Sequence, residues 1–234
     1  MVDNMKAYKR LKKMAETVDD LISNDVIVAD IATDHGYLAE LLDRNKKIKI
    51  VYASDISQKC LDKIVKLKKD FNLEKVVPLL GDGLMPYSKL DLAVIAGVGG
   101  LEIIKIITKQ NLQENGINKC NLFVLQPAQN VFEFRKWLYN QEIFIIKDFL
   151  VEDAKKFYPI IAVDLSRKQK NEWNLYNLFV GRDNDADSDV VQRYFKFVKE
   201  NFEYLEKIDK MVIEKDEVVR EKYEIYNMVN TLLK

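Results

Sequence analysis

Residues 26–37 read Val-Ile-Val-Ala-Asp-Ile-Ala-Thr-Asp-His-Gly-Tyr, and this stretch decides the fold. Apolar residues that are β-branched or small fill positions 26–29 and 31, which is typical of a strand buried on both faces of a parallel sheet. A turn of small and acidic residues with Gly36 follows, and the helical spacing of apolar residues begins at Tyr37. A strand, a tight turn and a helix in this order place a ligand at the carboxyl edge of a doubly wound sheet.

The composition indicates a soluble intracellular protein with one α/β domain and a small appendage. The chain has 234 residues, of which 48% are apolar, and its 37 basic and 37 acidic residues cancel. A nucleic-acid site would therefore be a local patch rather than a property of the whole surface. The two cysteines lack metal-site spacing, so we expect reduced thiols, no metal and a cytoplasmic location. No apolar stretch approaches the length of a membrane span, and we expect no leader segment.

The alternation of strand and helix repeats along the chain. We predict strands at 26–31, 48–53, 76–80, 90–96 and 121–126, with helices at 36–44, 57–71, 101–110 and 131–139. Two later apolar runs, Ile143–Val151 and Tyr158–Leu165, leave almost no room for a helix between them, which predicts an antiparallel hairpin. The predicted fold class is α/β, a Rossmann-like doubly wound sheet with an antiparallel edge hairpin, and it resembles that of class I methyltransferases.

The C-terminal part of the chain has a different pattern. Apolar density falls over residues 167–188, and apolar residues then recur every seventh position from Val191 to Leu233, with a polar break near 214–217. This spacing predicts two helices folded into an antiparallel coiled pair, with one long helix as the alternative. We therefore predict a methyltransferase domain at 1–182 and a helical coiled-coil domain at 183–234. The expected state is a monomer, with dimerisation through the tail as the alternative.

Basic residues gather at the start of the chain. A helix predicted at Lys6–Leu21 carries them on one face, and they are Lys6, Lys9, Arg10, Lys12 and Lys13. This face is either merely solvated or forms a basic lip beside the turn that follows Asp30.

Three acidic residues end successive predicted strands. Asp30, Asp55 and Asp82 are separated by 25 and 27 residues, which is one strand–helix repeat each. In a doubly wound sheet their carboxylates lie along one edge and bracket the ligand crevice. Asp55 would accept hydrogen bonds from ribose hydroxyl groups and Asp82 from an adenine amino group, while Asp30 would orient the first turn. The alternative is that these residues only cap helices.

The turn after the first strand does not suit phosphate. Asp34 would repel a pyrophosphate, and no glycine-rich phosphate-binding motif occurs there. Acidic residues instead suit a ligand with a sulfonium and an ammonium group, and S-adenosylmethionine has both.

Further candidate residues lie on the same edge. Residues 96–100, Ala-Gly-Val-Gly-Gly, allow the backbone to approach a ligand closely or form a loose turn. Gln126 ends the strand at 121–126 and can both donate and accept, so it could read an adenine edge. His35 is the only histidine and lies in the first turn, where we expect it to face ligand or substrate. Tyr37 could stack, but packing is the expectation.

Five motifs occur in a family-specific order and spacing, namely Arg10-Leu11, Asp30–Leu38, Gly81–Leu84, Ile95–Gly100 and Leu125–Pro127. In these motifs the chain resembles the TrmK family, bacterial tRNA methyltransferases that modify N1 of the adenine at position 22. Three positions depart from the family pattern, because Ala32, Val98 and Ala128 stand where the family usually has Gly, Met and Asn.

The resemblance implies S-adenosylmethionine as cofactor and tRNA as the partner. Adenine N1 has a free lone pair, so catalysis would consist mostly of aligning an unpaired or flipped-out base in a dry pocket. The basic N-terminal helix and the C-terminal helices would hold the tRNA backbone, with strong salt dependence. The alternatives are a methyltransferase of the same fold that acts on another RNA site or a small molecule, and a non-catalytic S-adenosylmethionine-binding module.

Two sets of site residues follow from the strand-end argument and the resemblance together. We expect the cofactor to be bound by Arg10, Asp30, Ala32, Thr33, His35, Gly36, Asp55, Ile56, Asp82, Gly83, Ala96 and Gly97. The expected catalytic residues are Asp34, His35 and Gln126.

Overall fold

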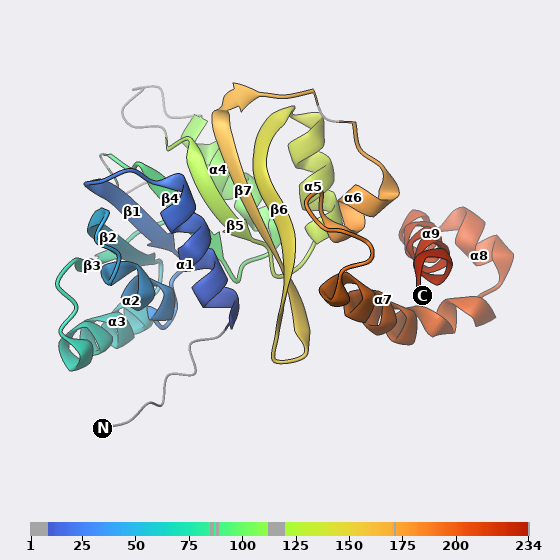
Figure 1. Ribbon diagram of the computed structural model, residues 1–234, viewed down its shortest axis with the longest axis horizontal. Coiled ribbons are helices and arrows are strands. Elements are labelled where there is room, and N and C mark those ends of the chain that lie inside the picture. The colour runs from blue at the N-terminus through green and yellow to red at the C-terminus, as the bar shows by residue number, and fades with distance from the viewer. Residues whose placement is uncertain (1–8, 85–86, 88, 112–119, 171, 234) are drawn as a thin grey trace.

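A seven-stranded mixed sheet forms the centre of the computed structural model, which describes residues 9–84, 87, 89–111, 120–170 and 172–233 (Figure 1). The strand order is β3-β2-β1-β4-β5-β7-β6, and β7 runs antiparallel to both of its neighbours. The strands are β1 (Val26–Ile31), β2 (Ile48–Asp55), β3 (Val76–Leu80), β4 (Leu92–Ala96), β5 (Leu122–Gln126), β6 (Ile143–Asp153) and β7 (Lys156–Lys168). This is the predicted fold class, with the order reversing between β1 and β4.

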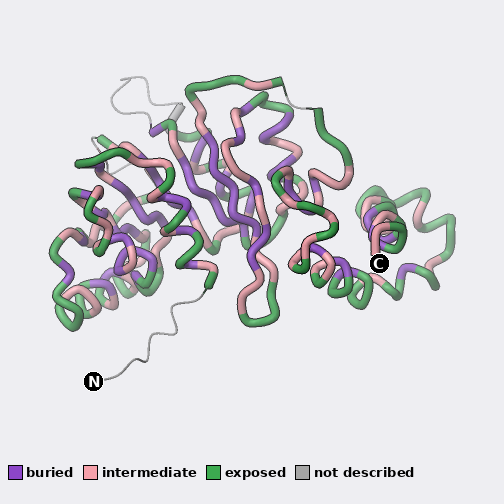
Figure 2. Tube along the Cα trace, in the orientation of Figure 1, coloured by how far each residue is buried: buried purple, intermediate pink, exposed green. Residues whose placement is uncertain are grey.

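Helices cover both faces of the sheet. One face carries α1 (Lys9–Leu21), α2 (Tyr37–Asp43) and α3 (Gln58–Phe71), and the other carries α4 (Gly100–Asn111) and α5 (Val131–Asn140). Alternation along β1 explains the two layers, because Val28 packs in the first core and Ala29 in the second. Figure 2 shows the buried residues concentrated in the central strands. Within the described ranges, none of these helices has the length and hydropathy of a membrane-spanning segment.

The apolar runs located the elements well. β1 and β3 have the predicted bounds. The hairpin is confirmed: its first strand begins at Ile143 as predicted and ends later, at Asp153, and its second strand extends beyond the predicted range at both ends. The part of the N-terminal helix before Lys9, with Lys6, lies outside the described residues. A short helix, α6 (Leu175–Val180), lies within residues 167–188, the segment in which the apolar density falls.

The tail contains three helices and a 3-10 turn rather than two helices. They are α7 (Asp189–Phe202), the 3-10 turn Glu203–Lys207, α8 (Lys210–Lys215) and α9 (Glu217–Leu232). α7 and α9 pack against each other through Phe195 and Val229, so the folded-back pair is correct and one long helix is wrong. Val212, one of the residues that recur every seventh position, is 47% exposed. It lies in the short helix α8, and the helical structure is interrupted both before α8 and at Asp216.

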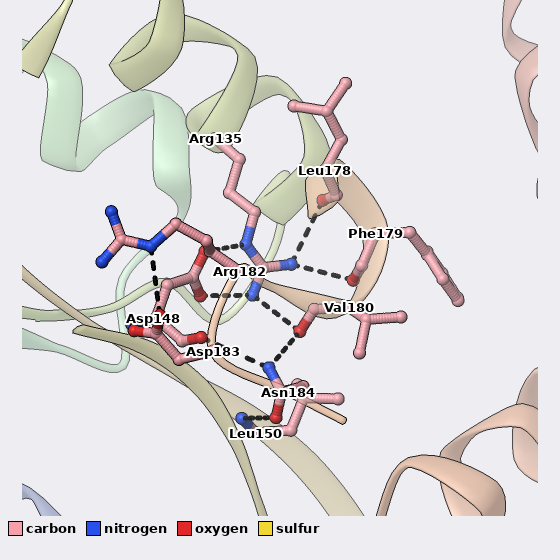
Figure 3. Close-up of polar contacts among 9 residues, drawn as sticks. All are labelled: Arg135, Asp148, Leu150, Leu178, Phe179, Val180, Arg182, Asp183 and Asn184. Atoms are coloured by element: carbon pink, nitrogen blue, oxygen red, sulfur yellow. Dashed lines mark hydrogen bonds and ion pairs between the residues drawn. The ribbon is translucent and has the colours of Figure 1, made fainter. Parts of the chain in front are cut away.

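The tail joins the sheet through a shared core and a buried ion pair. Leu150 of β6 and Val180 of α6 pack in the same cluster as α7 and α9. Arg135 of α5 pairs with Asp148 of β6 and also donates to carbonyl groups of α6, as Figure 3 shows. This apolar cluster crosses the predicted domain boundary between residues 182 and 183, and that boundary stays a prediction.

The hairpin also contacts the tail directly. Glu152 of β6 pairs with Arg193 of α7 at 2.6 Å. Its cross-strand neighbour Phe157 has its ring centroid 5.2 Å from that of Tyr194 and 5.6 Å from that of Phe197. One face of the hairpin tip is therefore packed on α7.

Candidate active site

A cavity of about 760 Å³ lies at the carboxyl ends of β1 and β4. It is bounded by the turn after β1, the turn after β4, the first turn of α1 and the tip of the hairpin. Its lining comprises Arg10, Leu11, Asp30, Ala32, Thr33, Asp34, His35, Tyr37, Leu38, Ala96, Gly97, Val98, Asp153, Ala154, Lys156 and Tyr158. The position is the switch point of the sheet, where the sequence predicts a ligand.

Asp30 is the buried carboxylate of this cavity. It is 3% exposed, and Thr33 Oγ1 donates to its Oδ2 at 2.6 Å. Burial raises the pKa of Asp30 to about 7, the bond from Thr33 opposes this in part, and the negative charge of Asp55 adds to it. Asp30 can therefore be brought to its charged form by a cation placed in the cavity.

The turn after β1 has an unusual backbone. Ala32 has φ 58° and Asp34 has φ 49°, both in the left-handed region that L residues other than glycine rarely adopt. The Asp34 amide donates to Asp55 Oδ2 at 3.3 Å, and the Ser57 amide donates to Asp55 Oδ1 at 2.9 Å. Asp55 thus ties the turn after β1 to the start of α3.

The three strand-end carboxylates lie along one edge, as predicted, because β1, β2 and β3 are adjacent and parallel. Asp82 accepts from Lys109 of α4 at 2.5 Å, and its side chain is 65% exposed. Ile56, directly after Asp55, is 74% exposed. An apolar side chain this open next to the Asp55 carboxylate suits a flat nucleoside, which needs an apolar face and hydrogen-bond acceptors.

Asp34 and His35 form a charged group at the cavity mouth. Asp34 Oδ2 lies 2.6 Å from His35 Nδ1, and Lys63 of α3 donates to Asp34 Oδ1 at 2.9 Å. Partial burial alone would raise the pKa of Asp34, but the bonds from Lys63 and His35 outweigh it and the pKa is lowered. Tyr37 is 40% exposed and stacks on His35 with ring centroids 5.6 Å apart, so the expectation that it packs is wrong.

Arg10 connects three elements on the opposite side. Its Nη1 donates to Gln126 Oε1 at 2.9 Å, its backbone amide donates to Asp153 Oδ2 at 3.1 Å, and its guanidinium carbon lies 4.7 Å from the ring centroid of Tyr158. Gln126 is fully buried, and its Nε2 donates to the Pro127 carbonyl at 3.0 Å. Both ends of the Gln126 amide are thus engaged within the chain, and its predicted contact with a base stays a prediction.

Gly97 opens the turn after β4. Its φ is 76°, and a Cβ built on it would meet nothing within 4 Å. The backbone there is exposed to the cavity in a conformation that glycine adopts without strain. A ligand can therefore approach the main chain at this position.

The structure divides the predicted site residues into two groups. Those that line the cavity are Arg10, Asp30, Ala32, Thr33, Asp34, His35, Ala96 and Gly97, and those outside its lining are Gly36, Asp55, Ile56, Asp82, Gly83 and Gln126. The hairpin residues Asp153, Lys156 and Tyr158 were missed. The predicted hairpin strands end at residue 151 and begin again at 158, so no sequence signal placed their side chains against α1.

The chain matches known methyltransferases. A family model described as a methyltransferase domain matches residues 8–161. A Mycoplasma pneumoniae protein named "Putative tRNA methyltransferase" is 32% identical over 199 residues, which cover 82% of this chain and 90% of the relative. The Bacillus subtilis tRNA (adenine(22)-N(1))-methyltransferase is 28% identical over 158 residues, covering 66% of this chain and 65% of that protein.

Solved structures share the fold over nearly the whole chain. The structure of Mycoplasma capricolum TrmK with the cofactor product S-adenosyl-homocysteine superposes with a TM-score of 0.75, at 23% identity, and covers 97% of this chain and 98% of that one. The domain match and the Mycoplasma pneumoniae relative agree with the motifs read from the sequence. The chain therefore carries a methyltransferase domain and belongs to the TrmK family.

Proposed function

We propose that this chain transfers a methyl group from S-adenosylmethionine to N1 of the adenine at position 22 of tRNA. The observation that carries the proposal is the cavity at the β1–β4 switch point, which has a buried carboxylate at its base and an open glycine backbone at its side. The name of the Bacillus subtilis relative supports the choice of nucleotide, and the complex of Mycoplasma capricolum TrmK supports the cofactor.

The residues present fit S-adenosylmethionine. Asp30 and Asp55 repel each other electrostatically, and a ligand with cationic groups relieves this repulsion. Asp30, Thr33 and Gly97 would hold the amino-acid end in the cavity, while Asp55 and Ile56 would hold the nucleoside along the β2 edge. When bound there, this cofactor supplies a methyl group on a positively charged sulfur.

The chain has to align the acceptor rather than deprotonate it. Adenine N1 attacks with its own lone pair, so a nitrogen–carbon bond forms as the carbon–sulfur bond breaks, and the sulfur keeps the electron pair of that bond. The positive charge passes from sulfur to the base ring. Asp30, Asp34 and Asp153 line the cavity, and their carboxylates favour a cation at either end of this transfer.

Basic groups that are not already paired with Asp34 or Gln126 border the cavity on α1 and on the hairpin tip. Lys9, Lys12, Lys155 and Lys156 are exposed on these two elements. The tail has nine basic and ten acidic residues between 189 and 234, so its overall charge does not favour a polyanion. We therefore assign the main phosphate contacts to α1 and the hairpin, and a smaller share to the tail than its sequence pattern suggests.

We also propose that the chain acts as a monomer in the cytoplasm, where tRNA is found. The seam residues Val191, Phe195 and Val198 are buried inside the same chain, so the heptad pattern is already used for folding.

Methyl transfer to an unmodified tRNA transcript tests the proposal. Labelled S-adenosylmethionine is supplied, and the product is mapped by primer extension, which stops at N1-methyladenine. We expect one stop, at position 22, and a loss of cofactor affinity in Asp82→Ala. The matched control is Asp70→Ala, which removes an exposed carboxylate at the far end of α3. Cofactor binding without transfer to tRNA would overturn the substrate, and equal cofactor binding by Asp82→Ala would overturn the role of that carboxylate.

A further inference from the structure

The hairpin tip extends beyond the edge of the sheet. β5 pairs with β7 from Leu122↔Asp164 to Leu125↔Ile161, while β6 and β7 continue to pair as far as Asp153↔Lys156. The tip therefore stands past the carboxyl end of β5 and walls the cavity on the side away from β2. The nucleoside-binding residues predicted at Asp55 and Asp82 lie on the other side of β1.

The side chains on one face of the tip point to the cavity. Successive strand residues face opposite ways, and Asp153, Lys156 and Tyr158 line the cavity while Glu152 and Phe157 contact α7. The hairpin thus forms a further wall of the cavity, in addition to the turns after β1 and β4. A wall of this kind is suited to the acceptor.

The turn that carries this face is strained. Ala154 and Lys155 form a two-residue loop with φ 49° and 63°, and such loops usually contain Asn and Gly. The left-handed region is unfavourable for L residues other than glycine. A two-residue loop held in this form fixes Asp153 and Lys156 directly opposite each other at the cavity wall.

Asp153 has one oxygen engaged by the chain. Its Oδ2 accepts from the backbone amide of Arg10 at 3.1 Å. In the described part of the chain, this amide is the one group that donates a hydrogen bond to the Asp153 side chain. The bond fixes the carboxylate at the first turn of α1. No residue in the described ranges donates to Oδ1, so this oxygen can accept from a donor inside the cavity.

Flat groups line the same cavity as this carboxylate. The Arg10 guanidinium covers one face of Tyr158 and is itself held by buried Gln126. The stacked rings of His35 and Tyr37 line the same cavity from the turn after β1. A purine ring fits chemically between such groups, since stacking on aromatic side chains holds unpaired bases.

We propose that Asp153 accepts a hydrogen bond from the 6-amino group of the acceptor adenine, and that Tyr158, held by Arg10, supports the ring. This inference rests on the proposed function and adds the residue that selects the base. The 6-amino group is adjacent to N1, so the same contact orients the attacking lone pair. A carboxylate also favours the positive charge that the ring acquires, and it repels the 6-oxygen of guanine.

The experiment compares two tRNA transcripts that differ in one group. One has adenosine at position 22 and the other has purine riboside, which keeps N1 and lacks the 6-amino group. We expect the wild type to lose about 10- to 100-fold in kcat/KM on purine riboside, which is the effect of one hydrogen bond to a charged group. In Asp153→Asn, whose remaining oxygen is held by the Arg10 amide, we expect kcat/KM on adenosine to fall by a similar factor and the preference for adenosine to disappear.

Two controls separate base reading from folding. Asp164→Asn changes a carboxylate at the other end of β7 that accepts from Ser166, and it should keep the wild-type preference. Affinity for S-adenosyl-homocysteine, measured by calorimetry, should stay within threefold of wild type in both variants. Tyr158→Phe should retain the transfer rate on adenosine, whereas Tyr158→Ala should raise KM.

The outcomes distinguish this inference from the function on which it rests. If the wild type transfers no methyl group to the adenosine transcript, the proposed function fails and the inference fails with it. If the wild type methylates that transcript and Asp153→Asn still prefers adenosine by the wild-type factor, only the assignment of Asp153 is overturned.

Discussion

Arg135 and Asp148 form a doubly hydrogen-bonded ion pair that is closed off from solvent. Arg135 Nε donates to Asp148 Oδ2 at 2.9 Å and Nη2 donates to Oδ1 at 2.8 Å, and both side chains are 0% exposed (Figure 3). The remaining donor capacity goes to the carbonyl groups of Leu178, Phe179 and Val180. The guanidinium therefore neutralises the buried carboxylate and hydrogen-bonds the last carbonyl groups of α6, and in this way it connects α5, β6 and α6.

Removing one side chain of this ion pair should destabilise the folded state. We expect Arg135→Met to lower the free energy of unfolding by about 3–5 kcal/mol, because it leaves the Asp148 carboxylate buried without a counter-charge. The measurement is urea denaturation followed by circular dichroism. Adding Asp148→Leu to Arg135→Met should restore part of the lost stability. If Arg135→Met alone has a free energy of unfolding within 1 kcal/mol of wild type, the pair is not the buried ion pair described.

Ala32 departs from the TrmK motif, in which glycine is usual, and its φ of 58° is a left-handed value that glycine adopts without strain. We expect Ala32→Gly to raise the free energy of unfolding by about 1 kcal/mol, since the left-handed strain exceeds the entropy that glycine adds. The control is Ala29→Gly in β1, which has no positive φ and should be destabilising. A loss of stability in Ala32→Gly equal to that of the control would argue against the strained turn.

The hairpin tip offers a second test of backbone strain. Replacing Ala154-Lys155 by Asn-Gly should stabilise the protein by about 1–2 kcal/mol, because both positions require positive φ. Thermal unfolding monitored by calorimetry measures the effect. Ala154→Pro is the opposing control, since proline fixes φ near −65° and should lower the melting temperature.

Asp30 predicts a pH dependence whose sign follows from its raised pKa. The pKa is about 7 in the folded chain against 3.8 for the ordinary group, so the folded state binds the proton more tightly. Its contribution to stability is fully present below pH 4 and is lost as the pH rises to 7, by up to about 1.4 kcal/mol per pH unit.

The measurement compares wild type and Asp30→Asn without cofactor between pH 4 and 8. The wild type should lose stability relative to the variant over this range and level off above pH 8. Parallel curves for the two proteins would show that Asp30 is not a buried, weakly ionised carboxylate.

Much of the fold was predictable because the strands are continuous apolar runs. Val26–Ile31 lies between Asp25 and a turn of small and polar residues, and Val76–Leu80 lies between Lys75 and Gly81, so their ends are visible in the sequence. α6 was missed because six residues give too short a window for a helical period. Arg135 and Asp148 could not be recognised as buried, because only the packed fold supplies each with its partner.

The strand–helix period made the candidate site predictable along the sheet edge. Asp30, Asp55 and Asp82 recur at the strand–helix period, and that period places them without any tertiary detail. Asp153 and Tyr158 depend on how far the hairpin pairs beyond β5, which polar residues 152–156 do not reveal. Gln126 was identified by its position, but its hydrogen bond to Arg10 comes from a helix 116 residues away in the chain.

The two faces of the hairpin tip connect the tail to the cavity. Glu152 and Phe157 are coupled to α7, and their immediate neighbours Asp153 and Tyr158 are coupled to α1. A displacement of α7, for example on binding of a macromolecule to the tail, would have a short path to the cavity, because the two sets of contacts lie on opposite faces of one β-ribbon. Binding of a full-length substrate to the tail would then influence the cavity, although no side chain in the described part of the tail reaches the reacting atoms.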